Sequence, residues 1–176
     1  IAKRAARDGA NIIIAAKTTE VHPKLPGTIY SAAEEIIEAG GSALPVKCDI
    51  RFEEQVESAV DAGVKEFGGI DILVSNAGVF SSSENLENID DKKWKQDLDI
   101  NLATHHRILR ECIPYLRLGI EPAVVFMGSR NVGAPGPGAG TYTIAKSGLT
   151  QMSRLATIEL SKYNIRVNTI HPDCVY

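Results

Sequence analysis

Five short apolar runs, separated by longer amphipathic stretches, constrain the fold of this chain more than any other feature. Each run has the length of a strand and is too hydrophobic for a sheet with one exposed face, so we expect strands that are buried on both faces. The runs are residues 12–16, 43–48, 70–75, 123–127 and 165–170.

The stretches between the runs have helical periodicity. They cover residues 29–39, 52–67, 91–116 and 142–162. Within residues 52–67, for example, apolar side chains recur every three or four positions and form one stripe. Alternating strands and helices predict an α/β fold with a doubly wound, Rossmann-like parallel sheet that helices cover on both faces. In such folds ligands bind at the carboxyl ends of the strands.

The length and composition predict one globular domain. The chain has 176 residues, of which 44% are hydrophobic and 23% charged, and this supplies enough apolar surface for a core. The net charge of −3 lacks the basic excess that binds nucleic acids or anionic membranes, and no apolar run is long enough to span a bilayer. We therefore expect neither a nucleic acid nor a membrane as a partner.

Cysteine and histidine usage argues against disulfides and metal sites. The three cysteines are odd in number, far apart and outside any C-x-x-C pair, which favours a reducing, cytoplasmic compartment. Peroxisomal and mitochondrial locations stay open, because their signals would lie outside this chain. His105 and His106 project about 100° apart on a helix, unlike a ligand pair at i and i+4, so we predict no metal and expect either one to form a pocket wall.

Tyr142 and Lys146 are the pair that says most about chemistry. The i, i+4 spacing places a phenol and an ammonium on one face of a helix. Because a nearby cation stabilises phenolate, the phenol can act as a general acid or base that moves a hydroxyl proton. Taken alone, such a pair is also common on ordinary amphipathic helices.

Three further features accompany this pair. Ser129 follows the run at residues 123–127, Asn101 lies on the preceding helix, and the turn Asn76-Ala77-Gly78 follows the run at residues 70–75. In combination these motifs resemble the short-chain dehydrogenase/reductase family, and the resemblance covers all 176 residues. It implies an enzyme that transfers a hydride between a nicotinamide cofactor and a carbonyl or alcohol.

The resemblance implies a catalytic role for four residues. Ser129 would hydrogen-bond the substrate oxygen, and Tyr142 would transfer the proton. Lys146 would stabilise the phenolate and hold the nicotinamide ribose, and Asn101 would anchor a water in the proton relay. Hydride transfer to a carbonyl develops negative charge on oxygen, which a hydroxyl and a phenol in a dry pocket stabilise. A strand-end serine, a helical asparagine and a surface Tyr/Lys pair remain the structural alternatives.

The same resemblance places the cofactor at the strand ends. A carboxylate after residues 12–16 would bind the ribose hydroxyls of NAD, but this chain has Lys17 and Thr18 there. A cation without a carboxylate favours the 2′-phosphate of NADP, while NAD stays possible and a solvated lysine is the structural alternative. The other implied cofactor contacts are Asp49, Ile50, Asn76, Ala77, Gly78, Tyr142, Lys146 and Pro172.

Three segments near these contacts need separate interpretation. Asp49 resembles the family residue that meets the adenine, but it equally suits an N-terminal cap for the helix near Phe52. Where relatives commonly have Pro-Gly, Asp173 follows the proline and brings a negative charge towards the nicotinamide side. The glycine-rich residues 133–140 are not a phosphate cradle, because two prolines remove N–H donors, and we expect a mobile loop beside the substrate.

The resemblance also implies what residues 1–176 lack. Residues 1–8 have the pattern of the tail of a crossover helix, so we expect a domain truncated at both ends. It would lack the family's first strand with its glycine-rich loop, and the C-terminal substrate segment. Because that strand is central in the family's sheet, we expect a gap in the sheet, low stability and poor nucleotide binding. A non-catalytic nucleotide-binding relic or interaction subunit is the alternative to an enzyme.

Narrower resemblances imply two classes of small-molecule carbonyl or alcohol substrate. Residues 8–49 resemble the hydroxysteroid dehydrogenase-like proteins, which implies a hydrophobic carbonyl. Residues from 117 onward resemble the dehydrogenase domain of bacterial rhamnulose-phosphate aldolase/alcohol dehydrogenase fusions, which implies a small aldehyde derived from a sugar.

The family habit of pairing helices across symmetry axes implies a homodimer or homotetramer. One apolar face within residues 142–162 suits this pairing, and it equally suits packing on the sheet. The face comprises Leu149, Met152, Leu155, Ala156 and Leu160.

Overall fold

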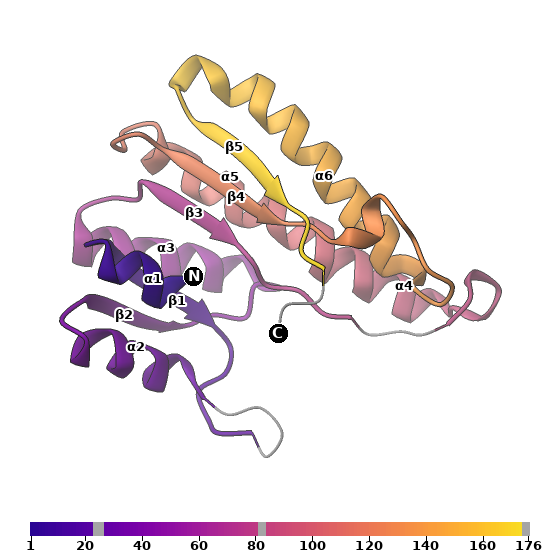
Figure 1. Ribbon diagram of the computed structural model, residues 1–176, viewed down its shortest axis with the longest axis horizontal. Coiled ribbons are helices and arrows are strands. Elements are labelled where there is room, and N and C mark those ends of the chain that lie inside the picture. The colour runs from indigo at the N-terminus through magenta and orange to yellow at the C-terminus, as the bar shows by residue number, and fades with distance from the viewer. Residues whose placement is uncertain (23–26, 81–83, 174–176) are drawn as a thin grey trace. The chain divides into compact units, whose positions relative to one another are not determined.

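The computed structural model describes residues 1–22, 27–80 and 84–173 (Figure 1). The chain divides into two compact units, Ile1–Gly69 and Ile70–Tyr176, and each contains its own parallel sheet. Within the described ranges no ladder joins the two sheets. The missing central strand that the resemblance implies stays a prediction. None of the described helices combines the length and the apolar character that crossing a bilayer requires.

The first unit is a two-stranded parallel sheet with three helices. Its elements are α1 (Ala2–Arg7), β1 (Asn11–Ala16), α2 (Ile29–Glu38), β2 (Ser42–Lys47) and α3 (Glu53–Phe67). Helix α2 starts at a capping box, in which Thr28 accepts from the backbone of Ser31 and Ser31 accepts from that of Thr28. Helix α3 packs closely on β1, because a Cβ at Gly63 would lie 2.2 Å from Cδ1 of Ile13.

The second unit is a three-stranded parallel sheet in the order β3-β4-β5. The strands are β3 (Ile72–Ser75), β4 (Ala123–Met127) and β5 (Arg166–Ile170), and the main helices are α4 (Asp91–Leu98), α5 (Thr104–Leu116) and α6 (Gly140–Leu160). Short turns of helix are η1 (Leu86–Asn88), η3 (Arg130–Val132) and η4 (Ser161–Tyr163). The predicted continuous helix at residues 91–116 contains a π-helical turn, η2 (Asp99–Ala103), between α4 and α5.

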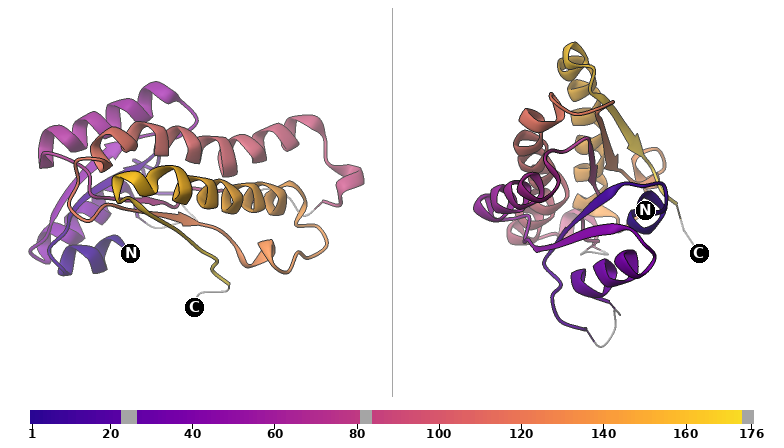
Figure 2. Two further views of the ribbon diagram at one scale, coloured as in Figure 1. Left: turned by 90° about the horizontal axis from the view of Figure 1, so that it is seen from above. Right: turned by 90° about the vertical axis from the view of Figure 1, so that its left-hand side faces the viewer.

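The expectation that every strand is buried on both faces is wrong for this second sheet. Helices α5 and α6 lie on the same face of it, as the left view of Figure 2 shows. Both crossovers run in the same direction across the sheet, and right-handed connections then place both helices on one side. Val124 and Phe126 point to the helices and are fully buried, whereas Ile72 and Ile170 on the other face are 59% and 50% exposed.

The apolar face predicted for α6 also divides. Leu149, Ala156 and Leu160 are buried inside the unit, at 0%, 6% and 6% exposure. Leu155 is 52% exposed, with Ile158 one turn further on at 74%. The five predicted residues therefore do not form one free surface: three belong to the core, Met152 is half-buried, and Leu155 lies on the outer side of the helix.

Candidate active site

The predicted site residues of the second unit either follow the carboxyl end of a strand or lie on a helix. The turn Asn76-Ala77-Gly78 follows β3, Ser129 follows β4 by two residues, and Tyr142 and Lys146 lie in the first two turns of α6. Asn101 is in the π-helical turn η2. Such turns interrupt helices frequently at functional sites, because one extra residue in the turn redirects a side chain.

Lys146 is a buried ammonium, with 3% of the residue exposed. Its Nζ donates to the carbonyl oxygen of Met127, at the end of β4, over 2.7 Å. Removal from water disfavours the charged form and lowers the pKa of Lys146 from 10.5 to about 8. The structural alternative of a surface pair with Tyr142 is therefore wrong, since the lysine is inside the protein.

Gly78 leaves room for this ammonium and for the Asn101 amide. A Cβ at Gly78 would lie 3.0 Å from Oδ1 of Asn101 and 3.5 Å from Nζ of Lys146. Asn101 is fully buried, and its amide binds both backbone groups of Val79: Oδ1 accepts from N and Nδ2 donates to O, each over 3.0 Å. Asn101 thus ties the segment after β3 to the π-helical turn, and the water that the resemblance implies for it stays a prediction.

Tyr142 is half-buried between an aromatic ring and the lysine. The ring of Phe80 meets it edge-on, with centroids 5.0 Å apart. Nζ of Lys146 lies 5.8 Å from the centroid of the Tyr142 ring. The i, i+4 spacing therefore brings the positive charge next to the phenol, as the sequence predicts.

Ser129 is buried at the start of η3, where its Oγ accepts from the backbone N–H of Asn131 over 3.2 Å. His171, the residue after β5, contacts the backbone of Ser129. Its Nδ1 lies 3.0 Å from the carbonyl oxygen and 3.3 Å from the amide nitrogen of Ser129. A Cβ at Gly128 would lie 2.6 Å from Nδ1 of His171, so only glycine fits beside this imidazole. No sequence pattern predicts this role for His171.

A cavity of about 370 Å³ adjoins the first turn of α6. Thr143 and Ile144, which follow Tyr142, form one wall, and the glycine-rich segment forms another, so that segment lies beside α6. Its expected place beside the substrate stays a prediction. Glu84 also lines the cavity, but its carboxylate is paired with Lys93 at 2.8 Å. The remaining lining is largely apolar and comes from Asn85, Leu86, Pro135, Gly136, Pro137, Gly138 and Gly140.

The remaining predicted contact of the second unit is Pro172. Its carbonyl oxygen accepts from the backbone N–H of Arg130 over 3.0 Å. Asp173 pairs with the guanidinium of Arg130 at 3.3 Å. The negative charge that the sequence predicts at this position therefore has a positive partner on η3.

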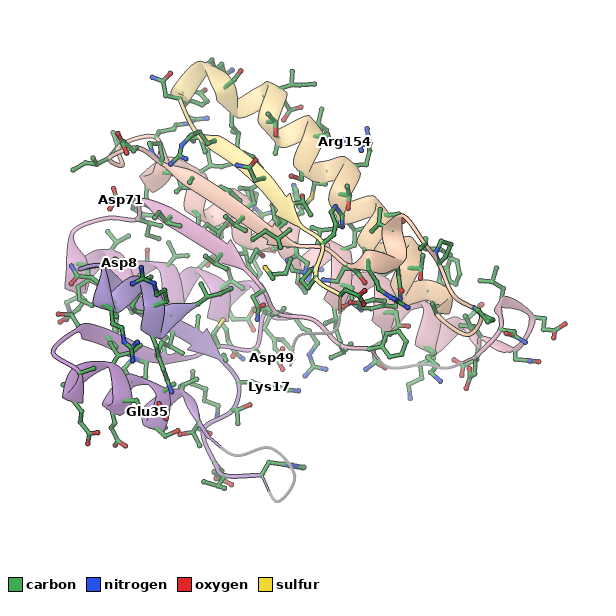
Figure 3. All side chains as sticks on the ribbon, in the orientation of Figure 1. Asp8, Lys17, Glu35, Asp49, Asp71 and Arg154 are labelled. Carbon is green, nitrogen blue, oxygen red and sulfur yellow. The ribbon has the colours of Figure 1, made fainter. Side chains whose placement is uncertain are left out.

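In the first unit, the predicted cofactor contacts follow β1 and β2. Lys17 and Thr18 are exposed after β1, and Asp49 and Ile50 follow β2; Figure 3 labels Lys17 and Asp49 there. The cap interpretation of Asp49 is wrong, because α3 begins after Phe52 with no side-chain cap. Asp49 instead accepts two bonds from Nε of Arg51, at 2.9 and 3.1 Å. Those bonds hold the pKa of the Asp49 carboxyl below its usual range.

Two further residues belong to these sites: Arg51, which the sequence interpretation did not single out, and His105, which it expected only as a pocket wall. Arg51 adds a second cation beside Lys17, and its signal was a basic residue two positions after Asp49. His105 is fully buried, with Nδ1 2.6 Å from Oγ of Ser75. Burial, and then the charge of Lys146, lower the pKa of His105 from 6.5 to about 4. The only sequence signal for it was its position one helical turn after Asn101.

Comparison with known proteins identifies relatives of the chain. A family model described as enoyl-(acyl carrier protein) reductase matches residues 1–176. Hydroxysteroid dehydrogenase-like protein 2 of Bos taurus is 46% identical over 181 residues, covering 98% of this chain and 41% of that protein. The chain therefore spans less than half the length of this relative. The match extends the predicted resemblance beyond residues 8–49, and the resemblance to the aldolase/dehydrogenase fusions stays a prediction.

Solved structures give the same result. A short chain dehydrogenase of Mycobacterium thermoresistibile is 38% identical with a TM-score of 0.89, covering 98% of this chain and 61% of its own. Carveol dehydrogenase of Mycobacterium avium, solved in complex with NAD, is 29% identical with a TM-score of 0.89, covering 97% of this chain and 64% of its own. Together with the family match over every residue, these relatives show that the chain belongs to the short-chain dehydrogenase/reductase family.

Proposed function

We propose that the protein transfers a hydride between NADP(H) and a small carbonyl or alcohol, with Tyr142 as the general acid/base. The observation that carries the proposal is the buried Lys146 ammonium, held by Met127 and lying 5.8 Å from the Tyr142 ring. A fixed positive charge beside a phenol stabilises the phenolate that remains after proton donation. Tyr142 donates its proton to the carbonyl oxygen in reduction and takes it back in oxidation.

A nicotinamide cofactor, when bound, would supply the hydride, and each unit by itself carries residues that suit one part of such a cofactor. Lys146 would hold the nicotinamide ribose. Gly78 has no side chain, and any larger residue at this position would fill the space beside the ammonium. At the strand ends of the first unit, Lys17 is an exposed cation, while the carboxylate of Asp49 is engaged by Arg51. Lys17 and Arg51 together outnumber the single carboxylate of Asp49, and the remaining positive charge favours the additional phosphate of NADP over the bare ribose of NAD.

The substrate side of the site favours an apolar carbonyl. The cavity next to Tyr142 is lined mainly by prolines, glycines and aliphatic side chains, and its one carboxylate is paired with Lys93. An apolar wall binds the hydrocarbon part of a ketone or aldehyde without leaving polar groups unpaired. A phosphorylated sugar aldehyde would need cations that these lining residues lack. Ser129 would orient the carbonyl oxygen for protonation.

A direct assay tests substrate and cofactor together. The whole natural protein containing this chain is mixed with NADPH or NADH and with two substrate sets, apolar ketones and aldehydes in one, sugar-derived aldehydes in the other. We expect oxidation of NADPH with the apolar set to be the fastest combination. Faster turnover of the sugar-derived set would contradict the substrate assignment. Tight NADPH binding without turnover of any carbonyl would favour the non-catalytic relic.

A further inference from the structure

The buried imidazole of His105 contacts two neighbouring strands at the same level. Its Nδ1 lies 2.6 Å from Oγ of Ser75, the last residue of β3. Its ring meets the ring of Phe126 on β4 edge-on, with centroids 6.2 Å apart. Ser75 and Phe126 are paired in the β3–β4 ladder. One side chain of α5 therefore holds both strands where their pairing ends.

The groups around Lys146 begin directly after this pair. Met127, the residue after Phe126, provides the carbonyl oxygen that accepts from the ammonium over 2.7 Å. On the other strand, the turn that follows Ser75 brings Gly78 against the ammonium nitrogen. Any movement of the last paired positions would therefore shift the acceptor of Lys146, its glycine neighbour or both.

The charge state of His105 suits this place. Lys146 is the charged group whose field acts on the imidazole, and burial acts in the same direction, so His105 stays neutral at physiological pH. A neutral imidazole shares one hydrogen with the Ser75 hydroxyl and brings no second positive charge next to the ammonium.

We propose that His105 is a positioning residue: through Ser75 and Phe126 it keeps the ends of β3 and β4 closed around the Lys146 ammonium and keeps water away from it. His105 acts through Lys146, and no contact with substrate or cofactor is assigned to it. The proposal rests on the proposed function only in that Lys146 belongs to the catalytic site. Its test measures the lysine itself and requires no turnover.

Carbon-13 NMR of lysine labelled at Cε, in the whole natural protein, follows the titration of Lys146. The signal is assigned from its absence in Lys146→Arg. His105→Leu keeps the bulk of the side chain and removes the hydrogen bond, and Ser75→Ala removes the same bond from the strand. We expect each variant to raise the titration midpoint of Lys146 by about one pH unit or more, because water then reaches the ammonium. The double variant should add little to the larger single shift.

Two further variants separate positioning from packing. Leu109→Ala, one turn further along α5 and also buried, loosens the same helix but leaves Ser75 and His105 in place. We expect it to lower stability in urea unfolding without moving the Lys146 titration. His105→Asn returns an amide near the position of Nδ1 and should restore the midpoint towards the unmutated value. An unchanged midpoint in both His105→Leu and Ser75→Ala, or an equal shift in Leu109→Ala, would overturn the proposal.

Discussion

Folding removes the charge of Lys146 from water. Burial of this charge lowers the stability of the folded protein, although the proposed mechanism requires the charge. Its pKa is lowered from 10.5 to about 8 in the folded protein. Between these values the unfolded chain binds more protons than the folded one, so stability rises with pH through this window, and the penalty is complete below the folded pKa. The penalty amounts to roughly 3 kcal/mol.

Replacing the ammonium should therefore remove a pH dependence. Relative to Lys146→Met, we expect the free energy of unfolding of the unmutated protein to rise by roughly 3 kcal/mol as the pH increases from about 8 to 10.5. Urea unfolding at a series of pH values measures the difference. Lys65→Met, on the exposed side of α3, is the matched control and should show no such trend. A constant difference between Lys146→Met and the unmutated protein would mean that the ammonium is solvated.

Lys17 determines cofactor choice in this account. Lys17→Glu replaces attraction of the 2′-phosphate by repulsion, whereas the ribose hydroxyls of NAD gain an acceptor. We expect the ratio of NADP to NAD affinity to fall on the order of tenfold, and the effect to shrink with added salt, because the contact is exposed. Titration of both cofactors at two salt concentrations measures the ratio, with Lys65→Glu as control. An unchanged ratio would mean that Lys17 is merely solvated.

Among the elements, the turn after β3 has little room for added bulk beside the Lys146 ammonium. Gly78→Ala places a methyl 3.0 Å from Oδ1 of Asn101 and 3.5 Å from Nζ of Lys146. We expect a loss of stability of about 1–3 kcal/mol together with lower turnover, since the amide or the ammonium must move. Gly133→Ala is the control, because nothing lies within 4 Å of its Cβ position. Urea unfolding and turnover rates are measured for both variants. Equal stability and equal turnover of Gly78→Ala and Gly133→Ala would contradict the crowding at this turn.

The sequence predicts an element well when the interactions that form it join residues close together in the chain, and poorly when they join distant residues. Periodicity is local, so it located all five strands in the described residues to within two positions, and it found the helix that carries Tyr142 and Lys146. The π-helical turn at Asn101 and the Ser75–His105 bond depend on segments far apart in the chain, and no local pattern encodes them. The exposed face of the β3–β5 sheet was missed because crossover direction, rather than hydrophobicity, determines which face the helices cover.

For the whole molecule, we propose a homodimer or homotetramer in which α6 contributes to the contact. The outer side of α6 exposes Leu155 and Ile158 at 52% and 74%, while its inner side packs in the core. Leu155→Glu places a charge on this outer side and should shift the sedimentation of the whole protein towards the monomer at micromolar concentration. Leu118→Glu, in an exposed loop, controls for the added charge. A monomeric unmutated protein would contradict the assembly.

The central claim, that Tyr142 transfers the proton, is tested most directly by removing one oxygen atom. In the whole natural protein, Tyr142→Phe keeps the ring beside Phe80 and Lys146 but cannot donate a proton. We predict that kcat falls about 100-fold or more, while the affinity for NADPH changes less than about twofold. Tyr163→Phe, whose ring stacks on Arg117 instead, should keep full turnover. Retention of most of the turnover by Tyr142→Phe would contradict the account.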